Sequence, residues 1–373
     1  MKKTSTLLAL IFLCISVMTA QNYRVIENGF DKVVVNFTAG NLSTMDVTTD
    51  DGAFSRITME NYHLATEVGM PQVPVMVKLL EIPLCDGISY TIRSSRYSDF
   101  TAEQLGIQHP LFPAQPSYTK SYTGPVEFVK NEAAYRTNSF YHRDLISVEK
   151  SGIMRNINIA TVYFSPVQYN PVTNTYRIYE DVEVEFTFDN ADIPGTYQMK
   201  NLHGNAVFNG LQSRVINPIH SDSRENTFDR PIKYLIVANS MFRGQLEEFV
   251  AWKKRQGLVV ETVYTDDANV GTTTTSIANY IKAEYTNATE VDPAPTYVLL
   301  VGDIAQIPVF NTQVSGESHK TDLYYFTWTT GDNYPDCYYG RFSAQNANHL
   351  ANILEKTMQY EQYTMPDPSS SAS

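Results

Sequence analysis

The sequence predicts an all-β sandwich followed by an α/β domain with a mainly parallel sheet. Two observations predict this order. Short runs rich in aromatic and β-branched residues, separated by turn residues, fill the range 21–190. From residue 231 to residue 373, strands that are apolar throughout alternate with amphipathic helices, a pattern typical of a parallel sheet covered by helices.

The composition excludes several classes of protein. The chain has 373 residues, 43% of them hydrophobic and 18% charged, which suffices for more than one core. The net charge of −12 argues against non-specific binding of nucleic acid. Three cysteines are too few for a scaffold stapled by disulfides, so packing must hold the fold.

Residues 1–20 have the layout of a secretory signal peptide. Two lysines precede an apolar stretch at 7–17, and Ala20 is the predicted last residue before cleavage. The stretch is about half of the roughly 20 residues that span a bilayer. No other segment is long and apolar enough to cross a membrane. We therefore expect a mature protein outside the cytoplasm, without a transmembrane segment.

The first domain is expected to contain short antiparallel strands. The predicted strands are Lys32–Phe37, Val73–Ile82, Tyr90–Ser94, Asn158–Phe164 and Val182–Phe188. Alternation at residues 157–163, the turn-forming cluster 170–174 and the return strand Thr175–Tyr179 predict a hairpin. Periodicity then fades and polar residues accumulate, so the range 191–230 is predicted to be a linker.

The second domain is expected to alternate strands and helices. The predicted strands are Tyr234–Ala238, Leu258–Val263 and Thr296–Val301, and the predicted helices are Gly244–Arg255, Ser276–Tyr285 and Asn346–Tyr363. Two further strands, Leu323–Trp328 and Cys337–Phe342, would flank the loop 329–336. Neither a Gly-x-Gly-x-x-Gly after the first strand nor a Walker sequence occurs, so nucleotide binding is not expected.

Two groups of carboxylates could form a site. Asp303 follows a buried strand, where it could bind a metal, act in catalysis or cap the turn. Asp332 and Asp336 lie in the loop 329–336, which also contains Gly331 and whose hard oxygens suit Ca²⁺ better than Zn²⁺. An ordinary hairpin turn is the alternative for that loop.

The cysteines and histidines indicate no catalytic site. After signal cleavage Cys85 and Cys337 remain, in different predicted domains, so a disulfide between them is not expected. The seven histidines form neither a metal-binding motif nor a pairing with a Ser, Cys or Asp motif. We therefore predict no catalytic residue in this chain.

Six stretches of the second domain resemble the first part of the gingipain-type cysteine peptidases, family C25. They are Tyr234–Ser240, Phe249–Val263, Ile277–Tyr285, Thr296–Pro308, Thr321–Tyr325 and Gly331–Ser343. Upstream, Gly69–Val75 and Val162–Phe186 resemble the β-sandwich propeptide of these peptidases. The resemblance implies a zymogen that a Gram-negative bacterium secretes or carries on its surface. Its peptidase domain would be a caspase-like α/β domain, of which part is present here.

The resemblance also implies a Cys-His dyad that cleaves polypeptide substrates. The family's Gly-His-Gly and Ala-Cys-Val-Asn-like motifs belong to a second subdomain, and neither occurs in this sequence. Because a thiolate nucleophile needs an adjacent imidazole, the chain as written is not expected to hydrolyse peptides. It is either a fragment of a peptidase precursor or a truncated product.

The family further implies structural Ca²⁺ and an activation cut. By analogy, Asp303, Asp332 and Asp336 would supply side-chain ligands, and Thr329 and Tyr334 main-chain oxygens. Activation would cut at Arg224 or Arg230, and solvated linker charges are the alternative for both. Arg136 and Arg143 are candidates for the basic residue with which the propeptide covers its own catalytic domain.

Three functions follow from these observations. The leading one is a secreted cysteine endopeptidase precursor without its catalytic subdomain. A variant within the family is the signal peptidase of type IX secretion. The alternative from another class is a non-catalytic secreted binding or adhesion module.

Overall fold

The computed structural model describes residues 22–365 except 142, 221–229, 315–316 and 330. The predicted signal peptide 1–20 with its cleavage residue Ala20, and the predicted processing residue Arg224, lie outside the described residues. Within the described part, no helix is long and apolar enough to cross a membrane.

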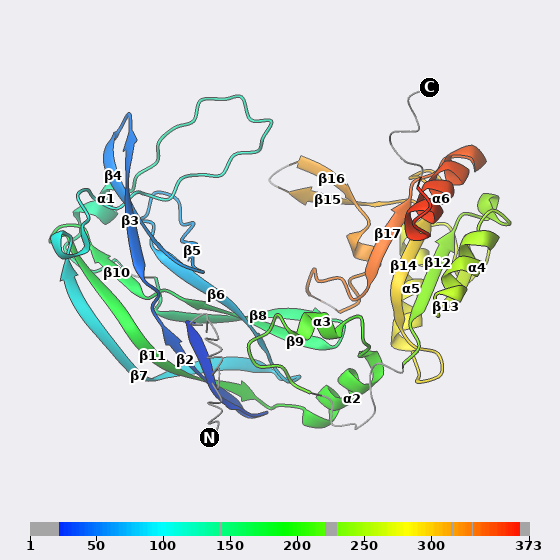
Figure 1. Ribbon diagram of the computed structural model, residues 1–373, viewed down its shortest axis with the longest axis horizontal. Helices are drawn as coiled ribbons and strands as arrows, with labels where there is room; N and C mark the ends of the chain where they lie inside the picture. Colours follow the sequence, from blue (N-terminus) through cyan, green and yellow to red (C-terminus); the bar gives the residue numbers. More distant parts are fainter. Residues whose placement is uncertain (1–21, 142, 221–229, 315–316, 330, 366–373) are drawn as a thin grey trace, which may run out of the picture.

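The first domain is a sandwich of two antiparallel sheets (Figure 1). One sheet has the order β1-β2-β11-β10, with β7 along the other side of β11. Its strands are β1 (Tyr23–Asn28), β2 (Lys32–Thr38), β7 (Gly87–Thr101), β10 (Val167–Asn170) and β11 (Thr175–Asp189). The second sheet has the order β5-β6-β9-β8. Its strands are β5 (His63–Leu64), β6 (Pro74–Glu81), β8 (Ile146–Met154) and β9 (Ile157–Phe164), and a separate hairpin joins β3 (Leu42–Thr49) to β4 (Gly52–Met59).

The core of the sandwich follows the period of two along its strands. In β11, alternate residues from Val182 to Phe188 are buried, and they pack with Phe37 of β2 against Leu80 and Phe164 of the second sheet. The intervening residues of β11 are polar and face away from this core. The predicted all-β domain is confirmed. The return strand of the predicted hairpin pairs with β10, whereas its predicted first arm, residues 157–163, lies in β9 of the other sheet.

The range predicted to be a linker contains two helices in its first part. They are α2 (Ile193–His203) and α3 (Asn209–Gln212). Asp192 begins α2 as its N-cap by accepting the backbone N–H of Gly195 at 2.9 Å. Lys200 on α2 is buried and forms an ion pair with the buried Glu81 at the end of β6.

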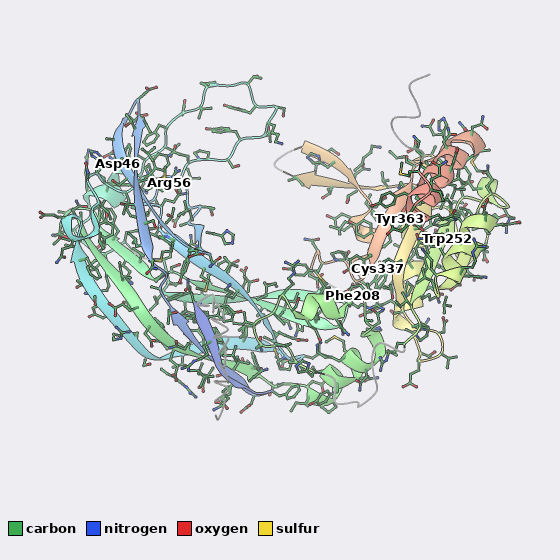
Figure 2. All side chains as sticks on the ribbon, viewed as in Figure 1. Asp46, Arg56, Phe208, Trp252, Cys337 and Tyr363 are labelled. Carbon is green, nitrogen blue, oxygen red and sulfur yellow. The ribbon has the colours of Figure 1, made fainter. Side chains whose placement is uncertain are left out.

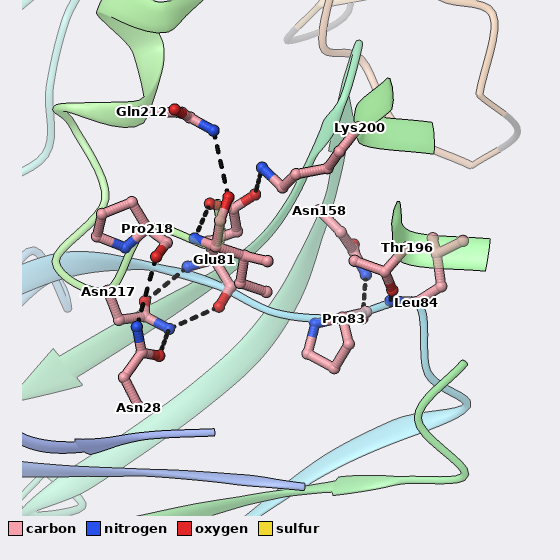
Figure 3. A network of polar contacts seen from close by, with 11 residues as sticks. Asn28, Glu81, Pro83, Leu84, Asn158, Thr196, Lys200, Gln212, Asn217 and Pro218 are labelled. Carbon is pink, nitrogen blue, oxygen red and sulfur yellow. Dashed lines mark hydrogen bonds and ion pairs between the residues drawn. The ribbon is translucent and has the colours of Figure 1, made fainter. Parts of the chain in front are cut away.

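Polar contacts bind the segment after α3 to the sandwich (Figure 3). The second carboxylate oxygen of Glu81 accepts the backbone N–H of Ile219 at 2.7 Å. The side-chain amide of Asn217 accepts the N–H of Glu81 and donates to its carbonyl, both at 2.8 Å. Burial raises the pKa of Glu81 and lowers that of Lys200, so each depends on the other for its charge. Residues 193–219 are therefore fastened to the first domain.

The second domain is a four-stranded parallel sheet with the order β13-β12-β14-β17. The strands are β12 (Lys233–Ala238), β13 (Val259–Tyr264), β14 (Pro295–Val301) and β17 (Tyr338–Phe342), and the helices are α4 (Glu247–Arg255), α5 (Thr274–Thr286) and α6 (Ala347–Glu361). Helix α5 covers one face through Ile277 and Ile281, and α4 and α6 cover the other through Phe249 and Leu350. The predicted α/β class is confirmed, because β12 and β14 bury side chains on both faces.

The prediction for residues 323–342 was wrong in one respect. Residues 323–325 form a 3₁₀ turn, and the antiparallel hairpin lies earlier, between β15 (Phe310–Val314) and β16 (Glu317–Thr321). Strand β17 pairs in parallel with β14, so the loop 329–336 is not a hairpin turn. Phe326 and Trp328 are buried in the core under α5 although they belong to no strand. A buried irregular segment and a strand look alike in apolar content, which explains the error.

The two domains meet at the amino ends of β14 and β17. The tip of the β8–β9 hairpin and the residues after α2 approach this edge of the parallel sheet, whereas β15 and β16 lie at its carboxyl edge (Figure 1). Figure 2 places Phe208 and Cys337 at the junction.

The buried pair of Glu81 and Lys200 yields a stability prediction. Lys200→Met leaves a carboxylate buried without its cation, so we expect the free energy of unfolding to fall by about 3–5 kcal/mol. The measurement is urea denaturation at pH 7. The double variant Glu81→Gln, Lys200→Met keeps an acceptor for the Ile219 N–H and should recover more than half of the loss. Equal stability of the two variants would contradict this account.

Candidate functional site

The contact between the domains is built around Arg155. Arg155 and Asn156 form the two-residue turn that joins β8 to β9, because Met154 pairs directly with Ile157. The backbone of Arg155 has a φ of 56°, which is uncommon for a residue other than glycine. Its side chain is 1% exposed and reaches into the second domain.

Backbone carbonyls hold the guanidinium of Arg155. Within the first domain, its Nε donates to the carbonyl of His203 at 2.6 Å. In the second domain it donates to three carbonyls, those of Pro295 at 2.7 Å, Ala294 at 3.1 Å and Asp336 at 3.2 Å. Among the described residues no carboxylate forms an ion pair with this guanidinium. Burial lowers the pKa of Arg155 to about 10, so it stays charged at neutral pH.

The second domain also binds the backbone of the hairpin tip. Asp336 accepts the N–H of Arg155 at 2.6 Å through Oδ1 and the N–H of Trp328 at 2.7 Å through Oδ2. Asp332 accepts the N–H of Ile153 at 2.9 Å. The hydroxyl of Tyr285 donates to the carbonyl of Arg155 at 2.8 Å. The N–H, the carbonyl and the side chain of one residue are thus all recognised.

A close approach at Gly152 fits the hairpin against Asp332. A Cβ on Gly152 would lie 2.5 Å from the Cβ of Asp332, and the φ of Gly152 is 144°. Both observations require glycine at this position.

Residues after α2 extend the contact. The ring of His203 stacks on that of Tyr285, with 4.0 Å between centroids and an interplanar angle of 12°. Asn205 donates through Nδ2 to the Thr296 hydroxyl at 2.8 Å, and both residues are buried. The ring of Phe208 lies 5.1 Å from that of Tyr338. We name this whole contact the Arg155 socket: Gly152–Arg155 and His203–Phe208 of the first domain against Tyr285, Ala294–Thr296 and Asp332–Tyr338 of the second.

Burial sets the protonation of the groups in the Arg155 socket. It raises the pKa of Asp336 to about 6 and lowers that of His203 to about 4, where the charge of Arg155 also contributes. Burial raises the pKa of the thiol of Cys337 well above its usual range. At neutral pH Arg155 and Asp336 are therefore charged and the imidazole of His203 is neutral.

Asp303 lies at the opposite end of the sheet from Asp332 and Asp336. It follows β14 at the carboxyl edge, where its carboxylate accepts from Gln345 at 2.7 Å and Ser343 at 2.8 Å. These bonds, led by that from Gln345, lower its pKa to about 2. Asp303 thus ties the residues after β17 to the end of β14.

The five residues assigned to Ca²⁺ by resemblance are split between the two ends of the sheet. The other oxygen of Asp332 accepts the backbone N–H of Tyr334 at 3.0 Å, so each carboxylate oxygen of Asp332 and Asp336 accepts an N–H. Thr329 is half-buried beside them. The described residues contain no group of three or more His, Cys, Asp or Glu side chains that could hold a metal. The calcium site stays a prediction.

The two cysteines of the described range 22–365 lack the features of a nucleophile. Both are free thiols, Cys337 buried and Cys85 half-buried. Burial raises the pKa of each, whereas a catalytic cysteine needs a lowered pKa. Of the predicted processing residues, Arg230 lies among the described residues, on the wall of a pocket of about 350 Å³ that also borders Arg155 and Glu290.

Sequence reasoning missed Arg155, His203 and Tyr285. The one signal was the turn Arg155–Asn156 itself. Between two β-type runs, a two-residue turn favours glycine, asparagine or aspartate, so an arginine there is unexpected for a turn in solvent.

Comparisons with known proteins cover almost the whole chain. The sequence model "Propeptide_C25" matches residues 21–212, just over half of the chain, and "Peptidase family C25" matches residues 227–372. Lys-gingipain of Porphyromonas gingivalis is 32% identical over 351 residues, which are 92% of this chain and 20% of that protein. Gingipain R1 of the same species is 25% identical over 347 residues, 91% of this chain and 33% of that protein. The chain thus spans about a fifth of the length of the Lys-gingipains it matches.

Two solved structures are also similar. One was described as structural insight into zymogenic latency of gingipain K from Porphyromonas gingivalis, with 29% identity, a TM-score of 0.41, and coverage of 45% of this chain and 92% of that one. The other is a complex of Porphyromonas gingivalis RgpB pro- and mature domains, with 19% identity, a TM-score of 0.43, and coverage of 52% and 97%.

His203 gives a prediction with a defined sign. Its folded-state pKa of about 4 lies below the ordinary 6.5, so the folded protein binds fewer protons than the unfolded chain between these values. Stability from His203 is present above pH 6.5 and lost as the pH falls towards 4. The variant His203→Phe keeps a ring on Tyr285 but does not titrate. Relative to this variant, the free energy of unfolding of the parent should fall by up to about 3 kcal/mol between pH 7 and pH 4.

The measurement is urea unfolding followed by tryptophan fluorescence at several pH values. Asp336 titrates with the opposite sign, and comparing the parent with His203→Phe cancels its contribution. Parallel pH profiles of the two proteins would show that His203 is not held neutral by burial.

A second experiment separates a calcium role of Asp332 from its contact with Ile153. We expect Asp332→Ala to lower the melting temperature equally in calcium and in a chelator, because the Ile153 and Tyr334 N–H groups lose their acceptor in both. The measurement is differential scanning calorimetry. A loss confined to calcium would instead establish the predicted ion.

Proposed function

Because the chain belongs to peptidase family C25 and carries the propeptide of that family, we propose that it is the amino-terminal part of a secreted cysteine endopeptidase precursor. The observation that carries the proposal is the Arg155 socket, which docks the propeptide domain on the α/β domain of the same chain. A propeptide held in this way is the intramolecular partner of the peptidase domain. Export by the signal peptide 1–20, with cleavage after Ala20, and an activation cut at Arg224 or Arg230 complete the proposal.

The docking leaves the carboxyl edge of the parallel sheet for substrate. In open α/β sheets, ligands bind beyond the carboxyl ends of the strands. The Arg155 socket is at the amino ends of β14 and β17, and Asp303 marks their carboxyl ends. A polypeptide substrate bound at the carboxyl edge would not compete with Arg155.

A long loop of the propeptide domain projects on the side of the carboxyl edge. Figure 1 shows this segment, between residues 113 and 131, extending towards β15 and β16. Its base is closed by Gln115, whose side chain exchanges two hydrogen bonds of 2.8 and 2.9 Å with the backbone of Val129. The rings of Tyr118 and Tyr122 stack on each other, with 4.6 Å between their centroids. The exposed Lys120 lies between them in the sequence.

This loop is better placed to cover the substrate face than the arginines proposed from sequence. Arg136 ends α1 (Glu132–Arg136), where it is exposed and pairs with Glu132 at 3.5 Å. Arg143 borders a shallow pocket with Glu67 and Asp144 on the sandwich. We therefore assign the covering role to the loop 113–131, with Lys120 as its basic residue.

Catalysis is assigned to residues beyond those of this chain. Burial raises the pKa of both remaining thiols, and the family's His and Cys motifs do not occur in the sequence. The 373 residues supply the propeptide, its docking surface and the first part of the sheet.

The test compares two proteins made from the source gene. The 373-residue chain should show no thiol-dependent hydrolysis of fluorogenic peptides that carry Lys or Arg before the reporter group. A chain extended by the downstream coding sequence should gain that activity after limited proteolysis and lose it on thiol alkylation. The double variant Cys85→Ser, Cys337→Ser of the extended chain is the matched control and should keep full activity. Loss of activity in that control, or activity of the shorter chain, would contradict the proposal.

A further inference from the structure

We propose that a groove between α4 and α6 binds a basic side chain of a polypeptide partner. The groove lies on the face of the parallel sheet opposite α5, and Figure 1 shows both helices at the end of the molecule away from the sandwich. Its lining residues are distinct from those of the Arg155 socket and from those at the carboxyl edge assigned to substrate. The inference does not depend on the proposed peptidase activity.

The α4–α6 groove has an apolar floor and an acidic rim, and its volume is about 430 Å³. Phe249 is buried in the floor, and Leu354 and Met358 are half-buried beside it. Glu248 and Glu355 are exposed on the rim. The other lining residues are small or uncharged: Gln245, Ala351, Gln359 and Gln362.

The groove runs along one stripe of α6. The residues of α6 that line it recur at positions 351, 354, 355, 358, 359 and 362, which is the spacing of a single helix face. At 1.5 Å per residue this stripe is about 16 Å long, enough for four or five residues of an extended peptide at about 3.3 Å each. The groove is therefore long enough for a short polypeptide segment rather than a single residue.

The carboxylates of the rim have no cation of their own. Among the described residues, neither Glu248 nor Glu355 forms an ion pair, and no lysine or arginine lines the groove. Lys253, one turn beyond the floor residue of α4, is held by Glu361 at 2.7 Å. The groove thus offers two negative charges to a partner, on a chain whose net charge is −12.

A basic side chain matches both parts of the α4–α6 groove. Lysine and arginine combine an apolar stem with a terminal cation, so the stem would pack on the floor while the cation lies between the rim carboxylates. Gln245 supplies a further acceptor. Its amide nitrogen donates to the carbonyl of Ala347 at 3.2 Å, and its Oε1 is buried and accepts from no described residue. An N–H donor at this end of the groove would satisfy that oxygen.

The experiment follows the methyl resonance of Met358 in the full chain by NMR, identified by its absence in Met358→Leu. The probe is the peptide acetyl-Ala-Leu-Lys-Leu-Ala-amide, and we expect it to shift the resonance in a saturable way. The same peptide with norleucine in place of lysine keeps the stem without the charge and should bind about fivefold more weakly, because the exposed ion pairs are lost.

Charge-neutral variants locate the interaction. In the double variant Glu248→Gln, Glu355→Gln, the lysine peptide should bind about fivefold more weakly and no better than the norleucine peptide. Glu247→Gln is the matched control, because Glu247 is an exposed acid of the same turn of α4 that does not line the groove. This control should bind both peptides as the parent does.

Three results would overturn the inference. They are equal affinity of the parent for the two peptides, unchanged affinity in the double variant, and no saturable shift at peptide concentrations up to about 10 mM. The substitutions are on exposed side chains, so the variants should fold, and circular dichroism verifies this. Hydrolysis by the extended chain is measured separately, so failure of the peptide-binding test leaves the proposed function unaffected.

Discussion

One buried cation determines how the two domains are placed. The guanidinium at the domain junction is buried, and each of its three nitrogens donates to at least one backbone carbonyl. The acceptors come from both domains, the carbonyl of His203 on one side and those of Ala294 and Pro295 on the other. Arg155 thus joins the β8–β9 hairpin and the residues after α2 to the amino edge of the parallel sheet.

The surrounding structure compensates the costs of this arrangement. A left-handed backbone at Arg155 costs roughly 1–2 kcal/mol relative to the ordinary region. Three charge-assisted or hydroxyl hydrogen bonds to the hairpin backbone, from Asp332, Asp336 and Tyr285, offset that cost. The opposite edge, where Asp303 accepts from Ser343 and Gln345, is organised by bonds within the second domain alone. One edge of the sheet thus contacts the first domain, and the other is held by bonds within the second domain.

The sequence was sufficient for the domain classes and for most strands, because burial on one or both faces leaves a period in the apolar residues. The alternation in β11 and the continuous apolar runs of β12 and β14 are local patterns of this kind. Phe326 and Trp328 were misplaced because an irregular buried segment has no period. The Arg155 socket could not be predicted, since its acceptors are main-chain carbonyls, which every residue possesses, brought together from parts of the chain as distant as residues 155 and 336. Asp332 and Asp336 were singled out for their oxygens, and in the structure those oxygens accept backbone N–H groups.

Because the acceptors in the second domain are main-chain carbonyls, the contact is less sensitive to substitutions there than to a substitution of Arg155. A substitution at Ala294 changes a side chain but leaves its carbonyl available, so sequence drift on this side of the junction need not weaken recognition. At residue 155, by contrast, the hydrogen bonds to these carbonyls come from a guanidinium, which no other residue type possesses. Substitutions of Arg155 are therefore expected to disturb the junction more than substitutions of the residues whose carbonyls accept from it. Side-chain pairs such as Asn205 and Thr296 also make the junction depend on residue type.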